Sequence, residues 1–187
     1  MLAHNLNCNN DGTVPQEAIK CKMLVMTTHE NFDETTQFFA LNDYFGGTKE
    51  NFIFFKQSML PAVSPEGKIL MKSKSEICMS PNGNGALLNA VGINQEVKSY
   101  VNQLDFVQII GVDNVLNKVL DPLHLGFSID RNYELSMKTC EKRNASEKVG
   151  VIGKSNGKYQ VIEYTELSDA LRNETEEDGK TLKFRHG

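Results

Sequence analysis

Two continuous apolar runs near the start of the chain predict the first strands of a sheet. The run "KMLVMTT" begins at Lys22, and the run "NFIFF" occupies 51–55. Both have the length of a strand, and neither alternates apolar with polar residues, which is typical of parallel strands buried on both faces. Between these runs, Phe38, Phe39 and Leu41 supply the apolar face of a predicted helix.

The ends of this helix are also suggested by the sequence. Asn31, followed three residues later by Glu34, resembles a capping box at the start of a helix. The pair Gly46-Gly47 predicts its end, because glycine favours the residues just past a helix C-terminus. The pattern therefore predicts a strand, a helix and a second strand in series.

The middle of the chain continues the alternation. The segment "LPAVSPEGKILMK" contains a Pro-Glu-Gly turn before a short strand. Residues 86–103 have a helical pattern, and the apolar run "FVQIIGVD" at 106–113 predicts a third buried strand. Its last residue, Asp113, therefore falls at the carboxyl end of a predicted strand.

The C-terminal part of the chain is more mixed. The segment "NVLNKVLDPLHLGF" predicts a helix broken at Asp121-Pro122, because the proline ring clashes with the preceding turn. The segment "LSMKTCEK" predicts a strand, and "VGVIGKSNGKYQVIEYTEL" predicts a β-hairpin that turns at Asn156-Gly157. The last residues, 172–187, are expected to be mostly solvated charge.

Alternating strands and helices predict the fold class, an α/β layered domain with a mainly parallel sheet, helices on both faces and an added β-hairpin. In such sheets, ligands bind beyond the carboxyl ends of the strands. Gln57, the Gly83–Gly85 loop and Asp113 each follow a predicted strand. These residues are therefore expected to converge on one ligand.

The glycine loop has a plausible chemical role. In "SPNGNGALL", which begins at Ser80, two glycines each lie beside an asparagine. Both residue types tolerate positive φ, so the loop can turn sharply and present backbone N–H groups to an anion or to the edge of a base. Asn-Gly is also a very common turn dipeptide, so a plain turn without a ligand is the alternative interpretation.

Composition narrows the function classes. The chain has 187 residues, which favours one domain, and its 20 basic and 24 acidic residues give a net charge of −4, which offers no electrostatic reason to expect nucleic acid. No run is long and apolar enough for a membrane span, and the N-terminus is too polar for a signal peptide, so a cytoplasmic protein is expected. The four cysteines are far apart in the sequence, which favours reduced thiols over a zinc site or disulfides.

Several motifs together resemble one enzyme family. In order and spacing, "MTTHENFDETTQFF", "FFKQSMLPA", "SPNGNGALL", "GVDN", "DPLHLGF", "EKRNASEKVGV" and "YQVIEYTEL" resemble the eukaryotic UDP-N-acetylglucosamine pyrophosphorylases from about Lys22 to the last residue. The resemblance implies a Rossmann-like nucleotide-sugar transferase sheet of the GT-A type. It also implies a reaction of UTP with N-acetylglucosamine 1-phosphate that gives UDP-N-acetylglucosamine and pyrophosphate, with Mg²⁺ as cofactor.

The resemblance also implies roles for particular residues. Gln57 matches the glutamine that contacts uracil, where an amide can both donate and accept hydrogen bonds. Gly83 matches a glycine whose backbone meets the base, and Asn84 matches a sugar contact. Asp113 matches the aspartate near the phosphates, where a carboxylate can bind Mg²⁺, although a helix N-cap is an alternative role.

Two further matches concern the sugar. Gly150 and Glu163 match the family's N-acetylglucosamine-binding glycine and glutamate, and a carboxylate can accept hydrogen bonds from sugar hydroxyls. Without the motif, Glu163 would be interpreted as an outward-facing strand residue. Tyr164 beside it is expected to pack, and His29, His124 and His186 match no family role.

The chain also departs from the family pattern. Ala86 and Leu88 stand where the family has a glycine and a tyrosine, and nothing in 1–20 matches its basic glycine-rich loop, so we interpret 1–20 as a tail or linker and 21–187 as a partial nucleotidyltransferase domain truncated at both ends. Low or absent activity of this chain is therefore expected. The alternatives are a UDP-glucose or UDP-galactose type of pyrophosphorylase, and a non-catalytic module that binds a uridine nucleotide or a partner.

Overall fold

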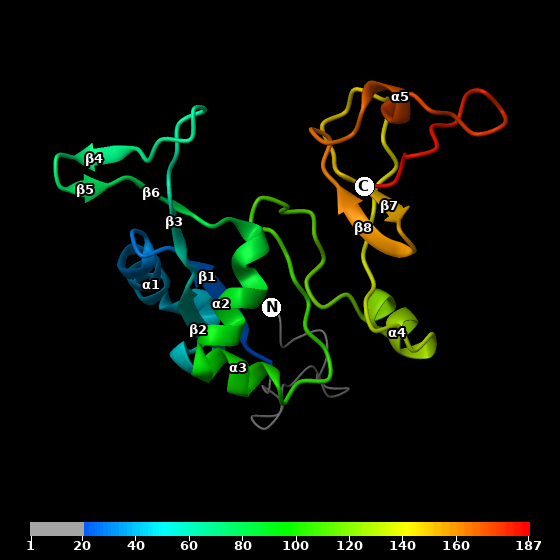
Figure 1. The fold of residues 1–187 in the computed structure, drawn as a ribbon. Coiled ribbons are helices and arrows are strands. Elements are labelled where there is room, and N and C mark those ends of the chain that lie inside the picture. The colour runs from blue at the N-terminus through cyan, green and yellow to red at the C-terminus, as the bar shows by residue number, and fades with distance from the viewer. Residues whose placement is uncertain (1–20) are drawn as a thin grey trace. The chain divides into compact units, whose positions relative to one another are not determined.

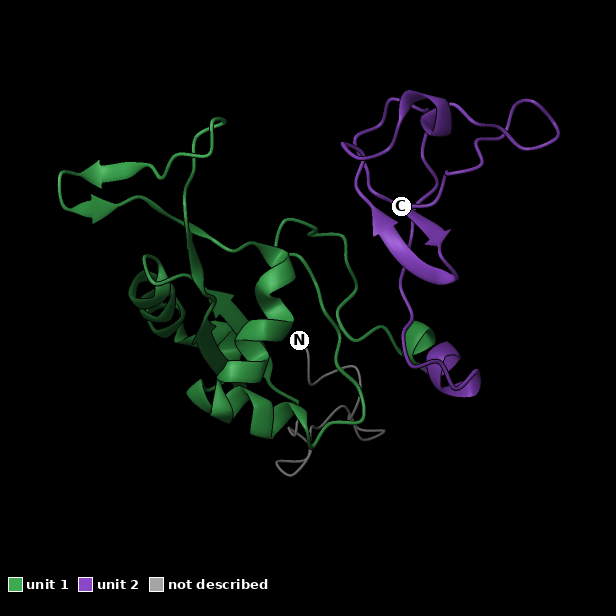
Figure 2. Cartoon of the chain, viewed as in Figure 1, with its two compact units in different colours: residues 1–125 green, residues 126–187 purple. Residues whose placement is uncertain are grey.

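The computed structural model describes residues 21–187, and the chain divides into two compact units (Figure 2). The first unit runs to Leu125, and the second is Gly126–Gly187. The predicted tail or linker at 1–20 lies outside the described residues.

The centre of the first unit is a pair of parallel strands, β1 (Met23–Thr27) and β2 (Phe52–Lys56) (Figure 1). The buried residues Ile53 and Phe55 of β2 form a core with Ala90 and Val97, so the helices α2 (Leu87–Ile93) and α3 (Gln95–Val101) cover this face. The first two predicted strands are therefore confirmed.

The opposite face of the two strands is covered by the helix α1 (Phe32–Leu41). Because side chains alternate along a strand, Phe52 and Phe54 point away from the Ile53 side. The Phe39 ring of α1 meets both, with centroid distances of 5.1 Å to Phe52 and 5.0 Å to Phe54. Helices therefore lie on both faces of the strand pair, as the sequence predicts.

The predicted start of α1 at Asn31 is confirmed, but the capping box is not formed, and the predicted end needs correction. The Asn31 side chain makes no capping bond to the helix and instead accepts hydrogen bonds from the backbone N–H and hydroxyl of Thr28, at 2.8 and 2.9 Å. The helix ends at Leu41, before Gly46-Gly47, because the residues from Asp43 to Gly46 all adopt positive φ. A right-handed helix cannot continue through that conformation.

After β2, the chain forms an arm built from paired hairpins. Strand β3 (Met59–Pro61) pairs antiparallel with β6 (Met79–Pro81), and β4 (Met71–Ser73) pairs with β5 (Glu76–Ile77). The predicted Pro-Glu-Gly turn is present, with a positive φ of 79° at Gly67. The short strand predicted after this turn is β4.

The predicted single helix at 86–103 is two helices. A short 3-10 segment, Asn84–Ala86, leads into α2, and α3 begins after Asn94. Asn94 has extended backbone angles, and its side-chain oxygen accepts a hydrogen bond from the Val97 N–H at 3.1 Å. Asparagine is a strong N-cap residue, so it starts a new helix here instead of continuing the previous one.

The third strand predicted at 106–113 is wrong. These residues form no ladder within the described part of the chain, and Val112 is 91% exposed. The Gln108 side chain bonds the backbone of Lys118 and Leu120, so the segment folds back on its own continuation. A β-strand needs a neighbouring strand for its backbone hydrogen bonds, and among the described residues no strand pairs with 106–113.

The helix predicted to be broken at Asp121-Pro122 is also different. The helix α4 (Pro122–Asp130) begins at the proline, and the residues before it form turns. Proline is well suited to the first helical position, because its missing N–H would have no partner there and its φ already fits a helix. The predicted break is therefore a helix start.

The second unit contains the predicted hairpin, β7 (Val151–Ser155) with β8 (Lys158–Ile162). Its turn has positive φ at both Asn156 (51°) and Gly157 (80°), as a two-residue turn between twisted strands requires. A short helix, α5 (Asp169–Arg172), follows. The predicted hairpin is confirmed.

The C-terminal segment is more ordered than predicted. Its backbone bonds two other segments, because the Arg185 carbonyl accepts from the Lys142 N–H at 2.7 Å and the His186 carbonyl accepts from the Ile152 N–H at 2.9 Å. The Arg185 guanidinium also lies 3.4 Å from Glu141 and 3.3 Å from Glu176. The strand predicted for "LSMKTCEK" is accordingly absent except for one bridge, between Glu141 and His186.

Three cysteines lie within the described residues, and Cys21, Cys78 and Cys140 are all free thiols. None of the helices described has the length and apolar character needed to cross a membrane.

The Asp178 carboxylate should control the local order of the C-terminal segment through pH. It accepts hydrogen bonds from the Thr181 hydroxyl and from the N–H groups of Lys180 (2.9 Å) and Thr181 (2.8 Å), and these bonds lower the pKa of Asp178 from 3.8 to about 2. A depressed pKa means that the stabilisation is complete above about pH 4 and is lost as the pH falls toward 2.

The Thr181 amide signal in NMR spectra should therefore titrate with a midpoint near 2, and Asp178→Asn should remove this transition. Glu177→Gln, at the exposed neighbouring position, serves as the control and should leave it unchanged. A midpoint near 3.8 in the unmodified chain would contradict the hydrogen bonding described.

Candidate functional site

Gln57 lies at the carboxyl end of β2, where ligands of parallel sheets bind. Its backbone N–H donates to the Thr27 carbonyl at 2.8 Å, which continues the pairing of the two strands by one residue. The side-chain oxygen Oε1 is buried and has no hydrogen-bond partner among the described residues. A buried acceptor without a partner is costly, so this atom is suited to a ligand donor.

The arm brings the glycine loop next to Gln57. Met59 is opposite Pro81, and beyond this pair the Asn82 N–H donates to the Ser58 carbonyl at 3.2 Å. The Asn82 amide also donates to the Ser58 hydroxyl at 3.2 Å. In an antiparallel register, the next position along places Gln57 beside Gly83. The structure therefore brings together two residues that are 26 positions apart in the sequence.

Gly83 has a backbone conformation that glycine alone adopts readily. Its φ is 80° and its ψ is −175°, a region closed to residues with a Cβ. A Cβ built at Gly83 would meet no atom within 4 Å, so the space around it is open. The prediction of positive φ in this loop is confirmed, and the glycine is required by the backbone even without a ligand.

Asn84 and Gly85 complete the exposed part of the loop. Asn84 opens the 3-10 segment before α2, and its side chain is exposed. Gly85 does not have positive φ, and a Cβ there would also meet nothing within 4 Å. The exposed asparagine amide is therefore available to a ligand that lies over the loop.

Asp113 is not positioned by a strand end, because the predicted strand is absent. It lies in an exposed turn after Gly111, whose carbonyl accepts from the Asn114 N–H at 3.2 Å. Among residues 21–187, no group of three or more His, Cys, Asp and Glu side chains could hold a metal ion. A single carboxylate fits Mg²⁺ that arrives with phosphates, since Mg²⁺ commonly binds one or two carboxylates, phosphate oxygens and water.

In the second unit, the hairpin register brings Gly150 and Glu163 together. Val151 pairs with Ile162, so Gly150 and Glu163 occupy the next opposing positions. A Cβ at Gly150 would lie 3.1 Å from a Val161 methyl group and 3.6 Å from the Glu163 carboxylate. A side chain at Gly150 would therefore be crowded by Val161, and glycine allows the two strands to approach closely beside the exposed Glu163 carboxylate.

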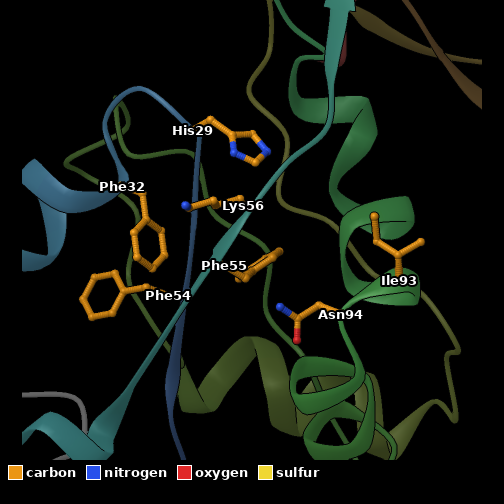
Figure 3. A pocket seen from close by; sticks show the side chains of 7 residues that line it. All are labelled: His29, Phe32, Phe54, Phe55, Lys56, Ile93 and Asn94. Carbon is orange, nitrogen blue, oxygen red and sulfur yellow. The ribbon is translucent and has the colours of Figure 1, made fainter.

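The sequence reasoning missed a second set of polar residues in the first unit. His29 and Lys56, at the carboxyl ends of β1 and β2, line an open pocket of about 450 Å³ together with Asn94 (Figure 3). Both follow apolar strands, so the rule that located Gln57 could have located them too. The contribution of Asn94 could not be predicted in this way, because it depends on the break between α2 and α3.

The backbone of Gly83 leads to a prediction on stability. Gly83→Ala should lower the free energy of unfolding by about 1–3 kcal/mol, because alanine is strained at this φ and ψ. Gly85→Ala is the matched control two residues away, and should change it by less than about 1 kcal/mol. Urea unfolding of both variants measures the difference, and equal effects would show that the Gly83 conformation is not required.

Comparisons with known proteins cover most of the chain. Residues 10–185 match the family described as UTP–glucose-1-phosphate uridylyltransferase. The chain is 38% identical to the UDP-N-acetylglucosamine pyrophosphorylase of Saccharomyces cerevisiae over 176 residues, which is 93% of this chain and 37% of that protein. It is 33% identical to UDP-N-acetylhexosamine pyrophosphorylase-like protein 1 of Xenopus tropicalis, over 87% of this chain and 32% of that protein.

The fold has a similar solved counterpart. The crystal structure of the uridine diphosphate N-acetylglucosamine pyrophosphorylase from Trypanosoma brucei in complex with an inhibitor has a TM-score of 0.75 and 35% identity, over 88% of this chain and 33% of that one. The predicted α/β nucleotidyltransferase fold is thereby confirmed. The chain spans about a third of the length of these relatives. It belongs to the UTP–glucose-1-phosphate uridylyltransferase family.

Proposed function

We propose that this chain provides the uridine- and sugar-binding part of a uridylyltransferase that joins UTP and N-acetylglucosamine 1-phosphate into UDP-N-acetylglucosamine and pyrophosphate. The observation that carries the proposal is the buried Oε1 of Gln57, which lies beside the Gly83 loop and has no hydrogen-bond partner in the part of the chain that the structure describes. Uracil presents an N–H between two carbonyl oxygens, and a glutamine amide complements this edge with one acceptor and one donor.

The sugar end of the substrate suits two groups of residues. In the first unit, Asn84 offers an exposed amide next to the proposed base-binding loop. In the second unit, Glu163 offers an exposed carboxylate beside Gly150. Amides and carboxylates bind sugar hydroxyls and the acetamido group through hydrogen bonds. The names of the relatives from Saccharomyces cerevisiae and Trypanosoma brucei support N-acetylglucosamine as the sugar.

The proposed chemistry is attack by a phosphate oxygen of the sugar phosphate on the α-phosphorus of UTP, with pyrophosphate as the leaving group. Catalysis of such transfers depends mainly on alignment of the two substrates and on neutralisation of phosphate charge. In the first unit, Gln57 and the Gly83 loop would fix the nucleotide, and Asn84 would contact the sugar. In the second unit, taken by itself, Gly150 and Glu163 would be the sugar-binding residues. Asp113 would hold the Mg²⁺ that screens the phosphates.

A cytoplasmic location is part of the proposal. The free thiols of Cys21, Cys78 and Cys140 support a reducing compartment, where such thiols persist.

The second candidate is a uridylyltransferase for glucose 1-phosphate. It is favoured by the description of the matched family and by Ala86 and Leu88, which replace a glycine and a tyrosine after the loop. Competition between UDP-N-acetylglucosamine and UDP-glucose for the full chain separates the two candidates. Equal affinity for both ligands would remove the case for the acetamido sugar.

Gln57→Leu tests the base-binding role, because it should have opposite effects on binding and stability. It should weaken binding of UDP-N-acetylglucosamine about tenfold or more, since both amide contacts to uracil are lost. It should raise the free energy of unfolding by about 1 kcal/mol, since a buried oxygen without a partner is removed. Calorimetric titration and urea unfolding measure the two effects.

The control is Gln37→Leu, at an exposed position of α1, which should change neither quantity appreciably. If Gln57→Leu leaves the affinity unchanged, the assignment of Gln57 to the base is wrong.

Asp113→Asn tests the proposed metal contact. In the unmodified chain, Mg²⁺ should strengthen the binding of UTP, because Asp113 would hold the ion and the ion would neutralise phosphate charge. The variant should lose most of this Mg²⁺ dependence and keep its affinity for uridine, which carries no phosphate. Asp105→Asn, at another exposed aspartate, should keep the dependence. An unchanged response to Mg²⁺ in Asp113→Asn would exclude this residue as the ligand.

A further inference from the structure

Strand β2 is paired with β1 along one edge and is open along the other. The Gln57 N–H points to β1, where it donates to the Thr27 carbonyl. Because backbone groups alternate in direction along a strand, the N–H and C=O groups of Phe54 and Lys56 point to the opposite edge. Within residues 21–187, none of these four groups forms a hydrogen bond. This edge therefore has the backbone groups to pair with a further strand.

Two hollows, of about 450 and 520 Å³, lie along the open edge. One is lined by the consecutive β2 residues 54–56 and the other by 52–54, so each includes side chains from both faces of β2. No residue of β1 belongs to the described lining of either hollow, which places both at the edge away from β1. Figure 3 shows Phe32 on one side of β2 and Ile93 on the other.

The open edge lies between two helical layers. Phe32 and Thr36 of α1 line the hollows on one side, and Ile93 of α2 and Glu96 of α3 line them on the other. Phe32 lines both hollows, so the two adjoin and form one edge slot along Phe52–Lys56. A strand in this edge slot would be covered on both faces. It would therefore have to be apolar on both faces.

The arm shows that this edge of the chain pairs with a strand where one is present. The Ser58 carbonyl, two residues beyond Lys56, points to the same edge and accepts from the Asn82 N–H at 3.2 Å, just after β6. The positive φ of 80° at Gly83 then turns the chain away. The edge is therefore occupied at Ser58 and open along β2.

The segment 106–112 has the pattern that the edge slot requires. Its apolar residues occur at both odd and even positions, so in an extended conformation both faces would be apolar. In the described part of the chain, the backbone groups of 106–110 form no hydrogen bonds. All the apolar side chains of the segment are exposed, namely those of Phe106, Val107, Ile109, Ile110 and Val112.

The segment does not reach the edge slot of its own chain by a favoured connection. The connection from β1 to β2 runs through α1 on one face, and the connection from β2 to 106–112 runs through α2 and α3 on the opposite face. Crossovers between parallel strands are right-handed in about 98% of cases. Right-handed connections on opposite faces move in opposite directions across a sheet, so the second one leads back past β1. The strand that fills the edge slot must therefore come from another chain.

We propose that two copies of this chain associate by exchange, each donating the segment 106–112 to the edge slot of the other. The donated strand pairs with the free N–H and C=O groups of Phe54 and Lys56, and its two apolar faces lie against α1 and against α2 and α3. Mutual exchange of one element is a low-cost route to a symmetric dimer. The inference goes beyond the proposed uridylyltransferase function and does not depend on it.

The charges at the end of the edge slot favour a parallel arrangement. His29 and Lys56 line the hollow at the carboxyl end of β2, and no carboxylate belongs to its described lining. Asp113 directly follows the donated segment. Parallel addition places this carboxylate at the Lys56 end, and continuous apolar runs are typical of parallel strands.

The donated strand is tested by light scattering of the full chain over a concentration series. The unmodified chain should form dimers, and Ile109→Asp should weaken the association about tenfold or more, because a carboxylate would be buried in the edge slot. Ile109 is 64% exposed in the single copy, so the fold should be kept. Leu116→Asp, at an 89% exposed residue outside the segment, is the matched control and should still dimerise.

The accepting side is tested by Ile93→Asp, at an exposed residue that lines the edge slot. This variant alone should also be monomeric. A mixture of Ile93→Asp with Ile109→Asp should form mixed dimers, because the intact segment of the first variant fits the intact edge slot of the second. Absence of mixed dimers, or an equal loss of dimers in Leu116→Asp, would overturn the proposal.

A synthetic peptide of residues 104–114 separates the second copy from other occupants. The peptide should compete with dimer formation, and the same peptide with Ile109→Asp should not. If the unmodified chain stays monomeric over the whole concentration series, the exchange is excluded. Peptide binding to such a monomer would assign the edge slot to a strand from a different protein and would likewise overturn the exchange.

Discussion

The parallel pairing of β1 with β2 is the constraint on which the first unit depends. It places Ile53 and Phe55 on one face and Phe52 and Phe54 on the other, so each face has its own helix partner. It also ends both strands at the same edge, which is why Gln57 is held there by the Thr27 carbonyl. Gln57 and the pocket residues His29 and Lys56, which lie at or just beyond the ends of these strands, therefore depend on the same five-residue register.

The antiparallel registers determine which of the predicted site residues lie near each other, as the parallel register determines which residues enter the core. Gln57 reaches Gly83 because Met59 is opposite Pro81, and Gly150 reaches Glu163 because Val151 is opposite Ile162. Backbone ladders thus fix both pairs while most side chains of the arm and hairpin stay exposed. A one-residue slip would separate either pair and turn its side chains to the other face.

The elements that the sequence predicts correctly are those determined by local preferences. Strands β1 and β2 have continuous apolar runs, and the turn at Asn156-Gly157 has residues that accept positive φ. Residues 106–113 have an equally apolar pattern but no partner within the described residues, and periodicity does not reveal whether a partner exists. The split at Asn94 and the convergence on the Lys56 pocket depend on tertiary placement, which spacing alone does not encode.

The Gln57–Gly83 position combines two unfavourable features in the chain without ligand. Gly83 has a backbone conformation that only glycine tolerates, and Gln57 Oε1 is buried without a partner among residues 21–187. If stability alone mattered, the Gln57 amide could turn outward and form hydrogen bonds with water. A planar ligand with an N–H donor would satisfy the oxygen and cover the open space at the glycine. The two costs are therefore most simply explained as the preorganisation of a site for such a ligand.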